Sequence, residues 1–155
     1  MKSKLKKNKK IRAYICAFSW IFVLAFMAFV FFLSSQEGTV SEELSQGFLI
    51  RISTLIGDTI GHNLLRKTAH AAEYFILSVL VSNAFLLSFS RARPFLSYFV
   101  CLAYSITDEI HQYFIPGRAC RVFDIFVDSI GSIFGIIVFM LLLFAISKIK
   151  GKTKQ

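Results

Sequence analysis

Four long apolar runs, separated by short polar stretches, dominate the hydrophobic pattern of this 155-residue chain. The runs cover residues 13–33, 64–89, 95–114 and 122–147. Each is long enough to cross the roughly 30 Å of hydrocarbon in a bilayer as a helix, which rises about 1.5 Å per residue. A helix also satisfies its own backbone hydrogen bonds, as lipid requires. The pattern predicts an all-α integral membrane bundle of four transmembrane helices.

The segment between the first two runs, residues 34–63, has a different pattern. Thr39 and Glu42 have the spacing of a capping box, and apolar residues then recur every four positions from Val40 to Ile52. This spacing predicts an amphipathic helix between the first and second transmembrane helices. Two placements remain open, one along the outer membrane surface and one over the mouth of the bundle.

Basic residues flank the apolar runs, and charged residues make up only 17% of the chain. Thirteen of the 18 lysines and arginines fall in residues 1–12, 91–93 and 148–155. Cytoplasmic segments carry the excess of Lys and Arg, so the count predicts a multi-pass cell-membrane protein with both N- and C-termini in the cytoplasm. Residues 1–12 and 148–155 are then basic tails around a membrane domain of residues 13–147. The bilayer is the expected partner. The net charge of +9 does not indicate nucleic acid, because no aromatic-basic patch on a soluble fold accompanies it.

Ionisable residues inside or beside the apolar runs are the most informative feature. They are Glu73, Asp108, Glu109, Asp124, Asp128, His70 and His111. Such side chains are costly in hydrocarbon and usually face a bundle interior or a water-filled cavity. Counting along each helix places them roughly 3–10 Å below the outer end of their runs. Spacings of three and four put those of each helix on one face. We therefore expect three helices to contribute to a single polar site in the outer leaflet.

The residue types at this site suit several kinds of chemistry. The candidates for acid–base catalysis are His70, Glu73, Asp108, Glu109 and His111. The candidates for ligand contact are Arg66, Lys67, Gln112, Arg118, Asp124 and Asp128. A divalent metal ion could be held by His70, Glu73, Asp108 and Asp124. No nucleophile elbow, zincin helix or phosphate loop is present, so the sequence specifies no reaction and leaves open whether the protein is an enzyme.

Two further patterns bear on how the helices pack. Gly131 and Gly135 continue the helical face of Asp124 and Asp128, and we expect them to allow close packing inside the bundle and not at a dimer interface. The Pro-Gly pair at residues 116–117 predicts a sharp turn that brings Arg118 over the acidic groups. Arg118 then either binds a ligand or neutralises a neighbouring carboxylate. The oligomeric state stays open.

Several short motifs in a fixed order resemble those of VanZ-like membrane proteins. They are Ser-Ser-Gln at residues 34–36, RKTAHAAEY at 66–74, DEIHQ at 108–112, PGR at 116–118 and the Asp and Gly pattern of 124–135. One departure is Asp128, where the family pattern often has Asn. The resemblance implies a bacterial cell-envelope protein. It also implies a link to glycopeptide resistance, because the founding member is associated with reduced sensitivity to teicoplanin.

Three functional hypotheses follow. The outward-facing site acts on a cell-envelope lipid or a lipid-linked cell-wall precursor, or it binds such a ligand without transforming it. Alternatively, the charged cluster is a structural ion-pair network that holds three helices together.

Overall fold

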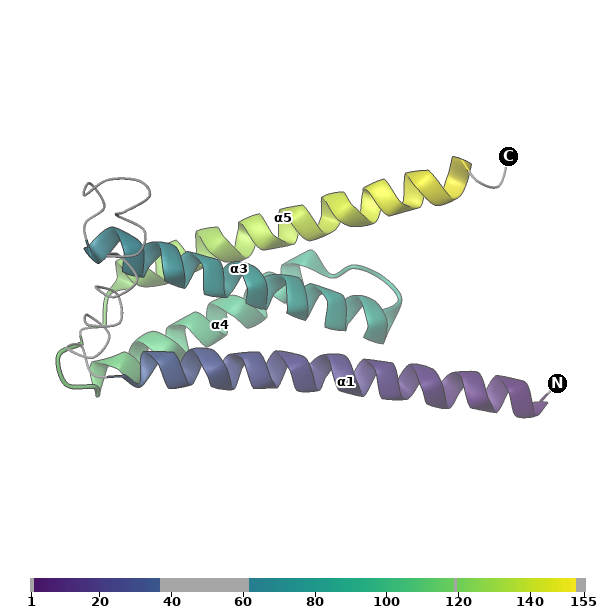
Figure 1. Ribbon diagram of the computed structural model, residues 1–155, viewed down its shortest axis with the longest axis horizontal. Coiled ribbons are helices and arrows are strands. Elements are labelled where there is room, and N and C mark those ends of the chain that lie inside the picture. Colours follow the sequence, from purple (N-terminus) through teal and green to yellow (C-terminus); the bar gives the residue numbers. More distant parts are fainter. Residues whose placement is uncertain (1, 37–61, 119, 153–155) are drawn as a thin grey trace, which may run out of the picture.

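The computed structural model describes residues 2–36, 62–118 and 120–152, without the side chains of residues 2–9, 62–66 and 150–152. Within these residues the only regular secondary structure is helical, which confirms the all-α part of the predicted fold class (Figure 1). The helices are α1 (Lys2–Ser34), α3 (His62–Phe89), α4 (Pro94–Tyr113) and α5 (Val122–Lys152). The amphipathic helix expected from Val40 to Ile52 lies outside the described residues and stays a prediction.

Three helical segments in the described part of the chain are long and apolar enough to cross a membrane. They are Lys10–Ser34, Lys67–Phe89 and Val122–Ile149. The segment α4 is not among them, and its last two turns carry Asp108, Glu109 and Gln112 within only 20 residues. The predicted count of four spans is therefore not confirmed.

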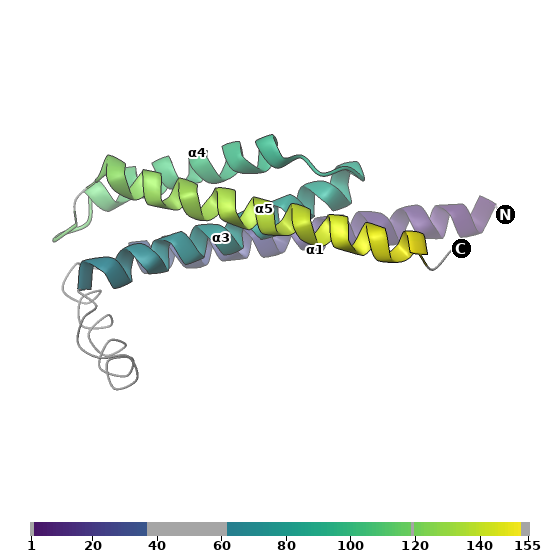
Figure 2. The same ribbon diagram turned by 90° about the horizontal axis from the view of Figure 1, so that it is seen from above.

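The helices run lengthwise beside one another (Figures 1 and 2). The beginning of α1 and the end of α5 lie at the same end of the bundle, and the turn between α4 and α5 lies at the other end (Figure 1). The helix α3 packs most extensively on α5, while α1 packs on α3 and over a smaller area on α4. The structure thus has an end that carries the termini and an end that carries the α4–α5 turn.

Two short connections set the ends of α4. Ser90, with a φ of 56°, ends α3 in the left-handed conformation, and its hydroxyl accepts a hydrogen bond from Arg12 on α1. Pro94 then occupies the first turn of α4, where a helix needs no backbone N–H donor. At the other end Gly117 has a φ of 76°, which glycine adopts without steric strain. The chain therefore reverses from α4 into α5 within a few residues, as the Pro-Gly pair predicts.

The apolar core lies between α1, α3 and α4. Val23, Leu77 and Val81 are fully buried there. Trp20 on α1 packs edge-to-face on Phe85 of α3, with ring centroids 5.2 Å apart. These contacts hold α1 against α3.

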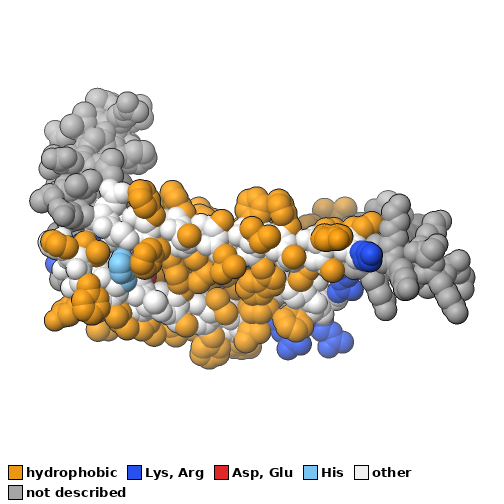
Figure 3. All heavy atoms as spheres, turned by 90° about the horizontal axis from the view of Figure 1, so that it is seen from below, with side chains coloured by type: hydrophobic (Ala, Val, Ile, Leu, Met, Phe, Trp, Pro, Cys, Tyr) orange, Lys and Arg blue, Asp and Glu red, His pale blue; other side chains and the backbone are white. Residues whose placement is uncertain are grey.

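Outside this core, apolar side chains are exposed and acidic side chains are buried, the reverse of the arrangement in a soluble protein. Large apolar side chains such as Phe18 and Phe144 are more than 60% exposed, whereas Asp108, Glu109 and Asp128 are buried. Hydrophobic side chains cover most of the face seen in Figure 3, and lysines and arginines gather toward the end that carries the termini. A surface of this kind fits contact with lipid, with the polar groups turned inward.

Candidate functional site

The predicted site residues lie toward the end of the bundle that carries the α4–α5 turn. Their positions are His70 and Glu73 on α3, Asp108, Glu109, His111 and Gln112 on α4, Arg118 in the turn, and Asp124 and Asp128 on α5. Arg66 and Lys67 belong to the first turns of α3, and the side chain of Arg66 lies outside the described part.

Asp108 joins α4 to the end of α1. Its Oδ2 atom accepts hydrogen bonds from the Ser34 hydroxyl at 2.9 Å and from the Gln112 side-chain amide at 3.0 Å. Gln112 also approaches the Ser34 hydroxyl at 3.4 Å. The site is therefore built by four helices and not by the three expected. The sequence singles out Ser34 only as part of a motif. Its position at the end of the apolar run of residues 13–33 is the signal that could have placed it near the polar site.

His111 lies beside the same end of α1. Its Nε2 atom and the Ser35 hydroxyl are 3.1 Å apart and share a hydrogen bond. The imidazole ring stacks on Phe31, with centroids 4.1 Å apart and planes inclined by 25°. These two contacts fix the orientation of the ring, which is partly exposed.

Asp128 connects α5 to both α4 and α3. The Ser105 hydroxyl donates a buried hydrogen bond of 2.7 Å to its Oδ2 atom. Its Oδ1 atom lies 3.8 Å from Nδ1 of His70, which in turn lies 3.9 Å from Oε2 of Glu73. Asp124 is close enough for its charge to act on Asp128. Carboxylates and an imidazole of α3 and α5, together with a hydroxyl of α4, thus form one continuous cluster.

The basic side chains lie around this cluster. Arg118 donates a hydrogen bond from Nη2 to the Leu33 carbonyl at 3.3 Å, and its charge acts on Glu73. Lys67 places its ammonium 4.3 Å from the centre of the Phe123 ring. Arg121 uses its backbone N–H, which donates to Glu109 Oε2 at 2.8 Å.

This set of residues, in this order, falls within a match to the VanZ/LLP1 family model over residues 18–144. The chain belongs to the VanZ/LLP1 family. Membership and the three long apolar helices together identify a VanZ-like membrane protein that contacts lipid. Comparisons with curated proteins and with solved structures found no match.

The site of this VanZ/LLP1 protein has two parts that differ in burial. We call the first the inner layer, which consists of the buried carboxyl groups of Asp108, Glu109, Asp124 and Asp128. We call the second the rim, which consists of the partly exposed side chains of Lys67, Glu73, His111 and Arg118. At the rim, the Glu73 side chain is 20% exposed, whereas that of Asp128 is fully buried. The rim is therefore the more accessible part of the site.

The glycines of α5 bring the inner layer close to α3. A Cβ atom added at Gly131 would collide with the backbone carbonyl of Ala71, with its carbon only 2.9 Å away. One added at Gly135 would collide with the Phe75 carbonyl and the Ser78 hydroxyl. This confirms the prediction that the glycines pack inside the bundle.

The predicted metal site is not supported by the geometry. In the described part of the chain, no group of three or more His, Cys, Asp and Glu side chains is arranged to hold a metal ion. Of the four expected ligands, His70 and Glu73 lie within 3.9 Å of each other, and Asp108 instead accepts hydrogen bonds from Ser34 and Gln112. The inner layer is better described as a hydrogen-bonded network.

Proposed function

We propose that this VanZ/LLP1 protein binds the phosphate-bearing head group of a cell-envelope lipid or of a lipid-linked cell-wall precursor at the rim. The observation that carries the proposal is the position of Lys67 and Arg118 beside a buried acidic layer at one end of the bundle. A guanidinium binds phosphate through two parallel hydrogen bonds, and an ammonium acts as a point charge. Arg118 is oriented by the Leu33 carbonyl, which lowers the entropy lost when a ligand binds.

The inner layer limits where such a phosphate can bind. Four buried carboxyl groups lie beside the rim, and ionised carboxylates repel an anion. The phosphate therefore stays among the partly exposed cations of the rim, while the lipid tail remains in hydrocarbon. This arrangement suits a lipid head group better than a small anion drawn into the bundle.

The distribution of basic residues supports an outward-facing site. Lys10, Arg12, Arg91, Arg93 and Lys148 all belong to the end that carries the termini. By the positive-inside rule that end faces the cytoplasm, and the rim faces outward. Lipid-linked cell-wall precursors are used on that outer side.

Glu73 and His111 give the rim groups that could transfer protons. Both are partly exposed, and the ring of His111 is fixed by Ser35 and Phe31. Positioned groups of these types act as general acids and bases. The proposal therefore has a catalytic and a non-catalytic form, which share one binding site.

Binding of a labelled lipid-linked precursor to the purified full-length protein tests the proposal. Arg118→Gln removes a charged hydrogen-bond donor, so we expect about tenfold weaker binding or more. Lys148→Gln is the matched control, because Lys148 is an exposed cation at the opposite end. Conversion of the bound precursor, measured by chromatography, would assign the catalytic form, and saturable binding without conversion the other. The proposal fails if the native protein shows no saturable binding.

The structural ion-pair network is a second candidate, favoured by the hydrogen bonds that join Asp108 to α1 and Asp128 to α4. Under this alternative, Glu73→Gln and Arg118→Gln lower the thermal unfolding midpoint of the protein. Under the binding proposal they leave it nearly unchanged, because rim side chains are partly exposed and surface ion pairs contribute little. Unfolding curves in detergent separate the two.

Family membership extends the binding proposal to glycopeptide sensitivity. If the protein changes how cell-wall precursors are presented, expression in a teicoplanin-sensitive bacterium should raise the inhibitory concentration of teicoplanin. Arg118→Gln should remove that increase at equal protein abundance. If the inhibitory concentration of teicoplanin still increases with Arg118→Gln, the rim does not determine teicoplanin sensitivity.

A further inference from the structure

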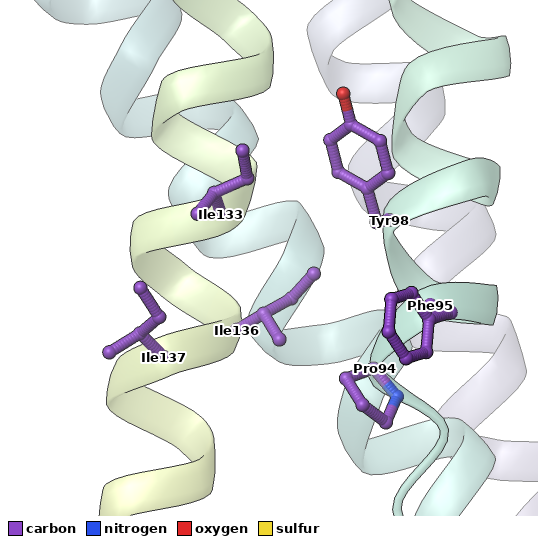
Figure 4. Close-up of a pocket in the computed structure, with 6 residues that line it drawn as sticks. All are labelled: Pro94, Phe95, Tyr98, Ile133, Ile136 and Ile137. Atoms are coloured by element: carbon purple, nitrogen blue, oxygen red, sulfur yellow. The ribbon is translucent and has the colours of Figure 1, made fainter.

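An apolar groove lies between α4 and α5, away from the polar cluster. The two helices are close at their connecting turn and diverge from there (Figures 1 and 2). Where they separate, a cavity of about 270 Å³ opens between Pro94, Phe95 and Tyr98 of α4 and Ile133, Ile136 and Ile137 of α5 (Figure 4). The rings of Phe95 and Tyr98 lie opposite the side chains of Ile133 and Ile136.

The groove opens sideways, toward the surroundings of the bundle. Ile136 at its base is 8% exposed, whereas Phe95 at its edge is 81% exposed. Its α5 wall belongs to the segment Val122–Ile149, which is long and apolar enough to span a membrane. The medium beside the groove is therefore hydrocarbon. The ligand whose chemistry matches the groove is an acyl chain.

Exposed cations lie directly beside the groove. Arg91 and Arg93 precede Pro94 in the α3–α4 connection, and Arg12 is held beside them by its hydrogen bond to Ser90. Within the described residues of α4 the nearest carboxylate is Asp108, which is 14 residues or about 20 Å further along the helix. This concentration of positive charge has no acidic counterpart at its own end of the described helices.

We propose that the groove binds an anionic phospholipid, with an acyl chain along Ile133 and Ile136 and the phosphate beside Arg91 and Arg93. Basic pockets between transmembrane helices bind acidic lipid head groups in this manner. Apolar contact adds little selectivity, because the acyl chain already lies in hydrocarbon. The selectivity for an anionic head group therefore comes from the two arginines. The site shares no residue with the rim and is independent of the function proposed there.

Lipid binding to the full-length protein in mild detergent tests this site. Dissociation constants are measured by native mass spectrometry for phosphatidylglycerol and phosphatidylcholine with identical acyl chains. We expect tighter binding of phosphatidylglycerol. The double substitution Arg91→Gln/Arg93→Gln should weaken phosphatidylglycerol binding roughly 20-fold at low salt, as the loss of two surface cations predicts. Binding of phosphatidylcholine should change little.

Two matched controls separate a built site from general attraction. Lys10→Gln/Lys148→Gln removes the same charge from exposed lysines of the same end and should leave phosphatidylglycerol binding within about twofold. Ile133→Trp fills the groove and should weaken both lipids, whereas Ile130→Trp, on an exposed position that does not line it, should not.

The following results would overturn the proposal. They are equal affinity of the native protein for both lipids, equal losses in the arginine and lysine double variants, and equal effects of the two tryptophans. Inorganic phosphate is included as a competitor, and displacement at the same concentration as phosphatidylglycerol would also overturn the role of the groove. The affinities of the native protein for the two lipids test the proposal even where a variant does not fold.

Discussion

Asp128 shows how this protein keeps a carboxylate fully buried among apolar helices. The Ser105 hydroxyl donates to one of its oxygens, and the His70 ring lies 3.8 Å from the other. A buried polar group without its partner destabilises a protein more than the net worth of the hydrogen bond. The serine of α4 is thus as important to this site as the charged residues that draw attention in the sequence.

Removal of the Ser105 hydroxyl should destabilise the protein. Ser105→Ala leaves Oδ2 of Asp128 without its donor and should destabilise the protein by about 1–3 kcal/mol. The thermal unfolding midpoint in detergent should fall by several degrees. Thr107→Val is the control, because Thr107 is exposed on the same helix and bonds only to the Ala103 carbonyl of its own helix among the described contacts. Equal midpoints for the two variants would contradict a role for Ser105.

Helical spacing was enough to predict which ionisable residues meet, but not their hydroxyl partners. His70 and Asp108 lie near Asp128, as their spacing along the three helices predicts, because the rise and the 3.6-residue turn of a helix fix the position and the face of each side chain. Ser34 and Ser105 gave no comparable signal. A serine in an apolar helix commonly bonds to its own backbone, so its spacing does not show whether it faces a neighbouring helix.

Among the helices, the packing of α3 on α5 positions the inner layer. Gly131 and Gly135 allow the backbones of the two helices to approach closely at Ala71 and Phe75. His70 directly precedes Ala71 on α3 and thereby reaches Asp128. The spacing of the glycines predicted close packing, and the acids on the same face predicted that it lies inside the bundle.

A larger side chain at position 131 should therefore push α5 away from α3. The first added carbon of Gly131→Leu already meets the Ala71 backbone, which cannot rotate away as a side chain can. Overpacking of this kind costs typically 1–3 kcal/mol, more than the roughly 1 kcal/mol gained in helix propensity. We expect a lower unfolding midpoint. Ala145→Leu adds bulk to an exposed position of α5 and should leave the midpoint unchanged.

The helix α4 shows that the sequence can predict a helix without deciding whether it spans the membrane. Its bounds, Pro94–Tyr113, agree with the apolar run expected over residues 95–114. Its mean hydropathy does not identify it as a span, because the polar groups of its last turns serve the buried site. Polar side chains that are satisfied by neighbouring helices lower the mean hydropathy of the segment that carries them. The length of the apolar run therefore predicted the helix, whereas its membrane placement stays open.

Across the whole molecule, charge separates the two ends of the bundle. Most described lysines and arginines lie at the end that carries the termini, whereas all five described carboxylates lie toward the other end with Lys67, Arg118 and Arg121. The positive-inside rule converts this asymmetry into an orientation. Cys120, exposed in the α4–α5 turn, provides a native site to measure it.

Thiol labelling of intact cells tests the orientation. A membrane-impermeant maleimide should label the native protein and fail to label Cys120→Ser, because the remaining cysteines are buried or partly buried in the bundle. Arg91→Cys placed in the Cys120→Ser background should react only after the membrane is permeabilised. The reverse pattern would place the termini outside and the rim in the cytoplasm.

The bond between Ser34 and Asp108 also links residues that are made at different times. They are 74 positions apart, so the ribosome completes α1 well before it reaches the acid that α1 will contact. Proteins are synthesised from the N-terminus at about 5–20 residues per second, which separates the two events by several seconds. When Asp108 is synthesised, its hydroxyl donor is already in place. A chain that ends before α4 lacks this acid, so the end of α1 acquires its contact with α4 only late in synthesis.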